Sequence, residues 1–179
     1  MSDGAVVWIL GRPAAGKSTM GRRLTAALRD EGVPCAMLDG DDVRAALGRP
    51  AGGSPEERDA FYEALAQLAA LLARQGLVVV VAATASRRAH RDRGRALGPR
   101  FIEVHVATSA EECERRDPKR LYARARRREI TGLPGVDEPF EEPLVSEVTA
   151  QDGEDERALS HVLLLLRLGT SGAATRVSP

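Results

Sequence analysis

The chain has 179 residues, of which 43% are hydrophobic and 29% are charged, so it can bury a core and is neither fibrous nor disordered. Its 26 basic residues are balanced by 26 acidic ones, which argues against a general attraction to nucleic acid or to an anionic membrane. Its apolar runs are far shorter than the roughly 18 residues that span a bilayer, and Met1–Gly4 lacks the basic residues that open a secretory signal.

The first part of the chain alternates apolar runs with a segment of helical periodicity. Six apolar residues from Ala5 to Leu10 end at Gly11, which is typical of a parallel strand covered on both faces. Apolar residues then recur at helical spacing from Ser18 to Arg29. A second strand is expected at Cys35–Leu38.

The middle of the chain continues this alternation. Ser54, followed by a proline and two glutamates, is typical of the start of a helix, which we expect to end near Arg74. Further strands are expected at Leu77–Ala82 and Phe101–Val106, with a basic segment of helical spacing between them. The alternation predicts an α/β fold with an open, mainly parallel sheet and helices on both faces.

The last part of the chain changes in composition. Ser109 begins another helix, which enters the arginine-rich stretch Arg115–Arg128, and Thr131–Glu147 is rich in proline, glycine and acid. A last amphipathic helix is expected at Glu154–Leu168. Because we find no repeat and no linker, we expect a single domain over residues 1–168, with a basic lid segment at about 115–143 and a disordered tail at 169–179.

The strongest motif in the chain binds phosphate. It matches G-x-x-x-x-G-K-S/T and lies between the first expected strand and the first expected helix, as the motif requires. In such a P-loop, backbone N–H groups surround phosphate oxygens, the lysine reaches the β- and γ-phosphates, and the serine hydroxyl binds Mg²⁺. The motif predicts a P-loop NTPase fold but does not separate kinases from GTPases and ATPases. Its residues are Gly11, Arg12, Pro13, Ala14, Ala15, Gly16, Lys17 and Ser18.

An acidic turn follows the second expected strand. It places carboxylates at the carboxyl end of a strand, the edge at which open α/β sheets bind ligands. Asp41 is placed to orient and deprotonate an attacking hydroxyl or to hold hydrated Mg²⁺, and Arg44 to bind an anionic substrate. The alternative is that the aspartates of this turn cap a surface helix.

Lys119 is unusual because 24 of the 26 basic residues are arginine and Lys17 is the only other lysine. A compact ammonium group suits a phosphate that moves, so Lys119 is a candidate for a second phosphate contact, and an exposed basic helix face is the alternative. The basic run has Tyr122 as its only aromatic residue and precedes an acidic segment. A lid over ATP therefore explains the run better than nucleic-acid binding does.

Together these motifs resemble the adenylyl-sulfate kinase family, whose members use ATP to phosphorylate the 3′-hydroxyl of adenylyl sulfate. Four blocks carry the resemblance, and the last, which begins Arg-Asp-Pro-Lys, is the most specific. The blocks are Gly11–Thr19, Leu38–Arg44, Phe101–Glu114 and Arg116–Glu141.

The resemblance implies a role for each matched residue. Asp41 would be the base or a metal-linked carboxylate, and Ser18 and Asp41 would be the metal-binding residues. Thr19 would join the P-loop in binding ATP, and Arg116 would lie near the ATP base. Lys17, Asp41 and Lys119 would carry the chemistry. The residues implied for the acceptor are Asp39, Arg44, Arg58, Arg88, Lys119 and Leu133.

The chain departs from the family pattern where the family holds the acceptor's adenine. Gly53 and Leu133 occupy the positions of two phenylalanines that sandwich this adenine in the family. Asp42 replaces an asparagine, and residues 61–64 replace an Asn-x-Arg-Arg motif. Because Phe61 and Tyr62 are the nearest aromatic residues in the sequence, we add Phe61 to the expected acceptor site.

We therefore expect an ATP- and Mg²⁺-dependent kinase that acts on a hydroxyl of an anionic small molecule, with adenylyl sulfate as the first candidate. The alternatives are a related kinase for another nucleotide-like or specialised-metabolite alcohol, and a catalytically silent nucleotide-binding partner protein. We expect no nucleic-acid or membrane partner and leave a homodimer open. The expected location is the cytoplasm, with Cys35 and Cys113 as free thiols.

Overall fold

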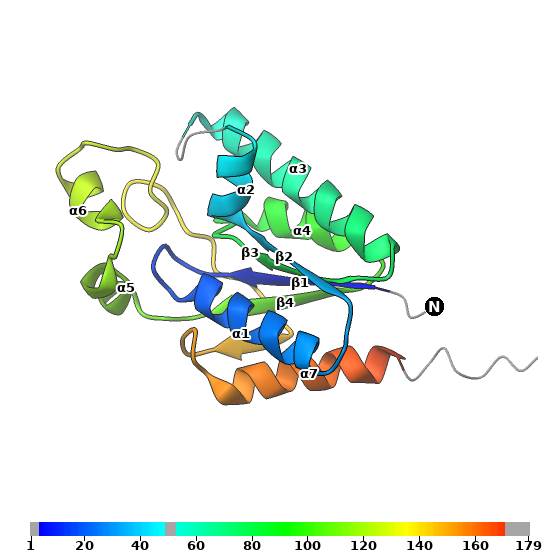
Figure 1. The fold of residues 1–179 in the computed structure, drawn as a ribbon. Helices are drawn as coiled ribbons and strands as arrows, with labels where there is room; N and C mark the ends of the chain where they lie inside the picture. The colour runs from blue at the N-terminus through cyan, green and yellow to red at the C-terminus, as the bar shows by residue number, and fades with distance from the viewer. Residues whose placement is uncertain (1–3, 49–52, 171–179) are drawn as a thin grey trace, which may run out of the picture.

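The structure is a computed structural model, and it describes residues 4–48 and 53–170. Its centre is a five-stranded sheet in the order β2-β3-β1-β4-β5, and each neighbouring pair of strands is parallel (Figure 1). The predicted open, parallel sheet is confirmed. The strands are β1 (Ala5–Leu10), β2 (Cys35–Asp39), β3 (Val78–Ala82), β4 (Phe101–Val106) and β5 (Val148–Ala150).

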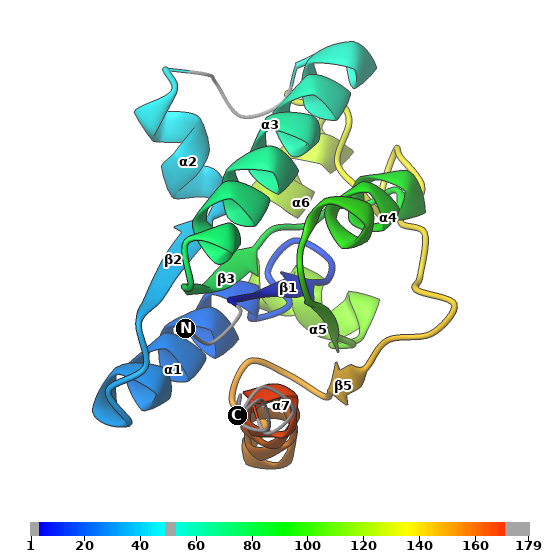
Figure 2. The same cartoon turned by 90° about the vertical axis from the view of Figure 1, so that its right-hand side faces the viewer.

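Helices cover both faces of the sheet, as expected. Figures 1 and 2 show α1 and α7 on one face and α3 and α4 on the other. No helix in the described residues is long and apolar enough to cross a membrane. The helices are α1 (Lys17–Asp30), α2 (Gly40–Ala46), α3 (Pro55–Arg74), α4 (Arg88–Leu97), α5 (Ala110–Arg116), α6 (Leu121–Arg126) and α7 (Glu156–Thr170).

The side chains of β1 alternate between two halves of the core. Val7 and Ile9 pack with the residues of α1 and α7, whereas Val6, Trp8 and Leu10 pack with those of α3. All five are at most 1% exposed. A strand covered on both faces needs apolar residues at every position, which explains the uninterrupted run in the sequence.

The predicted helix starts at Ser54 and Ser109 are confirmed. The Ser54 hydroxyl accepts the N–H of Glu57, and the Glu57 carboxylate accepts the N–H of Ser54, so the two residues form a capping box. The Ser109 hydroxyl accepts the N–H of Glu112 at the start of α5. Both serines therefore satisfy N–H groups that a helix start leaves unpaired.

The structure differs from the prediction at two places near the C-terminus. β5 was not predicted, because three residues next to an acidic, proline-rich segment give too short an alternation to recognise. α7 extends through Thr170, so Gly169 and Thr170 are helical and do not belong to a disordered tail. The rest of the expected tail, residues 171–179, lies outside the described residues.

A buried arginine fixes the place where the lid returns to the sheet. Arg91 of α4 is 1% exposed, and its guanidinium donates to the carbonyls of Ala85 (2.7 Å) and Glu141 (2.9 Å). The Glu103 carboxylate of β4 lies 3.4 Å from Arg91 and balances its charge. The segment after β3 and the end of the lid are thus joined through one side chain.

Candidate active site

The phosphate loop follows β1 and leads directly into α1. Gly16 has φ of 105°, and a Cβ atom there would lie 2.7 Å from the backbone nitrogen of Gly153, so this position requires glycine. No side chain caps the first turn of α1, and that turn contains no acidic residue. The unpaired N–H groups and the positive end of this helix therefore face the loop, an arrangement that binds phosphate.

Lys17 lies inside this loop. Its Nζ atom donates to the carbonyl of Arg12 at 2.8 Å. Burial lowers the pKa of Lys17 to about 8, although the carboxylates of Asp41 and Asp39 act in the opposite direction. A phosphate bound in the loop would add the negative charge that favours the ammonium form.

Ser18 meets the acidic turn at the carboxyl end of β2. Its hydroxyl donates to one carboxylate oxygen of Asp39, and the other oxygen of Asp39 accepts the N–H of Asp41 at 3.0 Å. Asp39 is thus the N-cap of α2. The alternative that the aspartates of this turn cap a helix is therefore correct for Asp39. Asp41 lies in the first turn of α2 and has no capping role.

The lid contacts the phosphate loop and the acidic turn. Tyr122 of α6 is 4% exposed, and its hydroxyl donates to the carbonyl of Pro13 at 3.0 Å. Lys119, which precedes α6, forms an ion pair with Asp41. Because the side chains of Lys119 and Asp41 are 60% and 63% exposed, this ion pair crosses the open mouth of the site.

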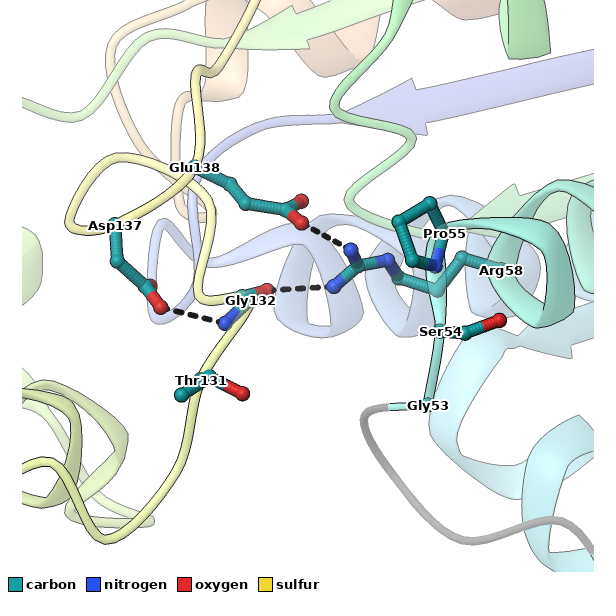
Figure 3. A pocket seen from close by; sticks show the side chains of 8 residues that line it. All are labelled: Gly53, Ser54, Pro55, Arg58, Thr131, Gly132, Asp137 and Glu138. Carbon is teal, nitrogen blue, oxygen red and sulfur yellow. Dashed lines mark hydrogen bonds and ion pairs between the residues drawn. The ribbon is translucent and has the colours of Figure 1, made fainter.

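A pocket of about 570 Å³ lies between the start of α3 and the lid (Figure 3). The Arg58 guanidinium points across it, donates to the carbonyl of Gly132 at 3.0 Å and forms an ion pair with Glu138. On the lid side, the Asp137 carboxylate accepts the N–H groups of Gly132 (2.6 Å) and Leu133 (2.7 Å) and so fixes the loop opposite Arg58. The lining residues are Gly53, Ser54, Pro55, Arg58, Thr131, Gly132, Asp137 and Glu138.

A known family matches most of the chain. The sequence model of the family described as Adenylylsulphate kinase matches residues 3–151. The chain belongs to the adenylyl-sulfate kinase family. The resemblance stated from the motifs is therefore confirmed.

Individual relatives in the family cover nearly the whole chain. The adenylyl-sulfate kinase of Paraburkholderia xenovorans is 38% identical over 173 residues, which are 92% of this chain and 96% of the relative. That of Shewanella denitrificans is 43% identical over 155 residues, which are 86% of this chain and 76% of the relative. The structure of the Mycobacterium tuberculosis APS kinase in complex with AMPPNP and APS has a TM-score of 0.86 and 34% identity, covering 93% of this chain and 99% of that one.

Two arginines expected on the nucleotide side of this adenylyl-sulfate kinase family member are Arg12, within the phosphate loop, and Arg116, which lies beside Gly16 of that loop. The Arg12 guanidinium lies 5.2 Å from the centre of the Phe140 ring and 3.3 Å from the Glu142 carboxylate, so it joins the loop to the end of the lid. Arg116 pairs with Glu112 at 2.6 Å and lies 3.8 Å from Asp152.

A turn after β5 packs against the other side of the phosphate loop. A Cβ atom at Gly153 would lie 2.9 Å from the Cβ atom of Thr19 and would meet the carbonyl oxygen of Gly16. The Thr108 hydroxyl donates to the carbonyls of Ala15 (2.7 Å) and Gln151 (3.1 Å). The turn is therefore fixed beside the loop and beside Thr19.

The structure corrects the expectation that Phe61 offers an open ring face to an adenine. Phe61 is 2% exposed, and the guanidinium carbon of Arg44 lies 3.7 Å from the centre of its ring. Tyr62 is 8% exposed, and its hydroxyl accepts the N–H of Ala85 at 2.9 Å. Both rings are enclosed because this face of α3 packs on the core. The family resemblance gave no sign that these two rings are buried.

Two other expected acceptor residues lie away from the pocket lining. Leu133 is 7% exposed and packs into the core with Tyr122, so its neighbour Gly132 lines the pocket instead. The backbone N–H of Arg88 donates to the Glu141 carboxylate at 2.7 Å, and its Nε donates to the Glu142 carbonyl at 2.8 Å. In this structure Arg88 therefore binds the end of the lid.

The sequence did not single out the acidic lid residues that shape the site. In the sequence, Asp137, Glu138 and Glu142 belong to the acidic segment that follows the basic run and argues against binding of a polyanion. The structure places the first two at the pocket and Glu142 beside Arg12. Asp137 and Glu138 lie within the most specific family block, Arg116–Glu141, and that position was the signal that could have identified them. Glu142 directly follows this block.

Proposed function

We propose that this chain transfers the γ-phosphoryl group of ATP to the 3′-hydroxyl of adenylyl sulfate. The observation that supports this most strongly is the ion pair between Asp41 and Lys119, since the charges of both act on Lys17 at the uncapped start of α1. Phosphoryl transfer needs a phosphate cradle, cationic groups near the moving phosphoryl group and a group that accepts the proton of the acceptor. The start of α1 provides the cradle, Lys17 and Lys119 provide the cationic groups, and Asp41 provides the group that accepts the proton.

The nucleotide is bound by the P-loop and by the residues beside it. The N–H groups at the start of α1 hold the β- and γ-phosphates, and Lys17 leaves the carbonyl of Arg12 to donate to them. Arg116 and the turn around Gly153 lie beside the loop and flank the nucleoside end. ATP is therefore the phosphoryl donor in this proposal.

Ser18 and Asp39 are the residues that fit Mg²⁺. Their side-chain oxygens are hydrogen-bonded to each other and are hard donors, which Mg²⁺ prefers. The described residues contain no cluster of three His, Cys, Asp or Glu side chains suited to a metal, but Mg²⁺ at nucleotide sites commonly uses one or two protein oxygens together with water and phosphate. When bound, the ion neutralises charge that develops between the β- and γ-phosphates. Of the expected pair, Ser18 is kept, and Asp39 replaces Asp41.

Asp41 is the base in this proposal. Asp39 is occupied by Ser18 and by its capping bond, whereas the carboxylate of Asp41 pairs with Lys119 on the lid. When a γ-phosphate is present, Lys119 donates to it and releases Asp41. The carboxylate then accepts the proton of the acceptor hydroxyl.

The acceptor occupies the pocket that Arg58 crosses. Arg44 and Arg58 bind its anionic end, and the lid residues Gly132 and Glu138 enclose it. The lining supplies no aromatic ring among the described residues, and stacking contributes about 1–3 kcal/mol per base where it occurs. That composition favours, as a second candidate function, a kinase for another anionic alcohol.

The experiment that separates the two candidates is ADP release with a panel of acceptors. Purified protein with ATP and Mg²⁺ is given adenylyl sulfate, AMP, a nucleoside without phosphate, gluconate or shikimate. The proposal predicts the highest kcat/KM with adenylyl sulfate. A much higher kcat/KM with a different anionic alcohol would replace it by the second candidate, and ATP binding without turnover of any acceptor would indicate a silent partner protein.

A further inference from the structure

Arg44 rests on a platform formed by two aromatic rings of α3. Its guanidinium carbon lies 3.7 Å from the centre of the Phe61 ring and 5.9 Å from that of Tyr62. The two rings meet edge to face with their centroids 5.5 Å apart. The electron-rich face of a ring attracts a cation at such distances. We call Phe61 and Tyr62 the aromatic platform.

Core packing and contacts with neighbouring residues fix both rings of the aromatic platform in place. Phe61 is 2% exposed and belongs to the core beneath α3. Tyr62 is held by its hydroxyl, which accepts the N–H of Ala85, and by stacking on His90 at 4.3 Å between centroids. Because neither ring is free to turn, the platform determines where the guanidinium of Arg44 can lie.

In the part of the chain that the structure describes, no carboxylate neutralises the charge of Arg44. Many arginines of this chain pair with a carboxylate, but within residues 4–48 and 53–170 no carboxylate lies within ion-pair distance of Arg44. A guanidinium has five N–H donors, so its contact with the Phe61 ring leaves donors for an anion. Arg44 is therefore ready to bind an anion with several hydrogen bonds at once.

Arg44 lies near both the acceptor pocket and the proposed base. Phe61 lies one helical turn after Arg58, which lines the pocket, so the two side chains are neighbours on one face of α3. Asp41 lies one turn before Arg44 in α2. An anion held by Arg44 is thereby placed beside the pocket and beside the proposed base.

We propose that Phe61 is a positioning residue that fixes the guanidinium of Arg44 for the anionic group of the acceptor. Phe61 does not touch the acceptor and acts through Arg44. This inference rests on the proposed function, because it assigns Arg44 to the acceptor of that same reaction. It also gives a role to a phenylalanine where the family motif has asparagine.

The test is a double-mutant cycle between Phe61 and Arg44. Five proteins are compared: wild type, Phe61→Tyr, Phe61→Leu, Arg44→Gln and Arg44→Gln/Phe61→Leu. KM for ATP, KM and kcat for adenylyl sulfate, or for the best acceptor of the panel, and calorimetric affinity for that acceptor are measured. Urea unfolding of each protein shows whether a variant is merely unstable.

The inference predicts a specific pattern. Phe61→Leu raises KM for the acceptor by about 3- to 30-fold, the range expected for a cation–π contact, and changes KM for ATP by less than about twofold. Phe61→Tyr keeps the ring and stays close to wild type. In the Arg44→Gln background, Phe61→Leu has no further effect on the acceptor, because the two residues act as one unit.

Two results would overturn the inference. One is an equal effect of Phe61→Leu with and without Arg44, which would make Phe61 a core residue only. The other is a rise in both KM values together. If the wild type binds adenylyl sulfate without phosphorylating it, the proposed function fails, and the same cycle on the affinities still decides the role of Phe61. If it neither binds nor phosphorylates any anionic acceptor, both proposals fail.

Discussion

Lys119 of the lid forms an ion pair with Asp41, in the first turn of α2. Two segments 78 residues apart in the sequence therefore meet at the mouth of the phosphate loop. The pair is exposed, so it adds little to the free energy of unfolding. Its importance lies in the chemistry, because one partner is the proposed base and the other is a cation that can move to phosphate.

Replacing Asp41 by asparagine tests the base directly. Asp41→Asn should lower kcat by roughly 10²–10⁴ and leave ATP affinity nearly unchanged, because a neutral amide of similar shape cannot accept the proton. Asp42→Asn is the matched control, since it removes the neighbouring exposed carboxylate and introduces the residue usual in the family. Single-turnover rates measure the difference. A rate for Asp41→Asn within a few-fold of wild type would move the role to Asp39.

The lowered pKa of Lys17 predicts a pH dependence of nucleotide binding. Below about pH 8 the ammonium is already present and binds phosphate, so affinity should stay constant there. Above about pH 8 a proton must be taken up before binding, and affinity should fall by up to about tenfold per pH unit. Calorimetry between pH 7 and 9.5 measures this, with Lys17→Arg as the variant that does not lose its charge. A flat wild-type profile would contradict the burial of this ammonium.

Gly153 supports the phosphate loop through its lack of a side chain. Gly153→Ala would bring a Cβ atom against the Gly16 carbonyl and within 2.9 Å of the Thr19 Cβ atom. The loop should shift, and kcat/KM for ATP should fall by about 10- to 100-fold. Gly98→Ala is the control, because a Cβ atom there meets nothing closer than 3.5 Å. If steady-state kinetics gave the same kcat/KM for ATP with both variants, the close contact of Gly153 with the phosphate loop would be contradicted.

The buried pair Arg91 and Glu103 should matter for folding. Burial raises the pKa of Glu103 and lowers that of Arg91, while each partner's charge opposes the shift of the other. Glu103→Ala should reduce the free energy of unfolding by about 3–5 kcal/mol, because it leaves the Arg91 charge buried without its partner. The double variant Arg91→Met/Glu103→Leu should lose less, as urea unfolding would show. A larger loss in the double variant would mean that Arg91 stabilises the fold through the ion pair together with its hydrogen bonds to the carbonyls of Ala85 and Glu141.

Much of the fold could be predicted because its signals are local. The apolar runs of β1, β3 and β4 and the cap at Ser54 depend on neighbouring residues and on burial of both sheet faces. β5 has only three residues and depends on pairing with β4, so its existence is decided by tertiary contacts. The extension of α7 to Thr170 shows how little the sequence says about a helix end.

The site, like the fold, has parts that local sequence predicts and parts that depend on tertiary contacts. The P-loop and the acidic turn are contiguous motifs, and the structure has them where the sequence placed them. The pocket is built from residues 53–58 and 131–138, and which side chains face it depends on how the lid packs. For this reason the sequence predicted that Leu133 and Phe61 contact the acceptor, although the core encloses both side chains. For the same reason it did not predict that Glu138 lines the pocket.

In the proposed reaction the γ-phosphoryl group of ATP passes to adenylyl sulfate, so the most informative measurement follows that group. ATP labelled in its γ-phosphate is incubated with Mg²⁺, adenylyl sulfate and either wild-type protein or Asp41→Asn, and the product is separated and its phosphate position assigned by ³¹P NMR. We predict label on the 3′-oxygen of adenylyl sulfate with wild type and almost none with the variant. Label that appears only as free phosphate, or on a different anionic alcohol supplied in competition, would contradict the proposed function.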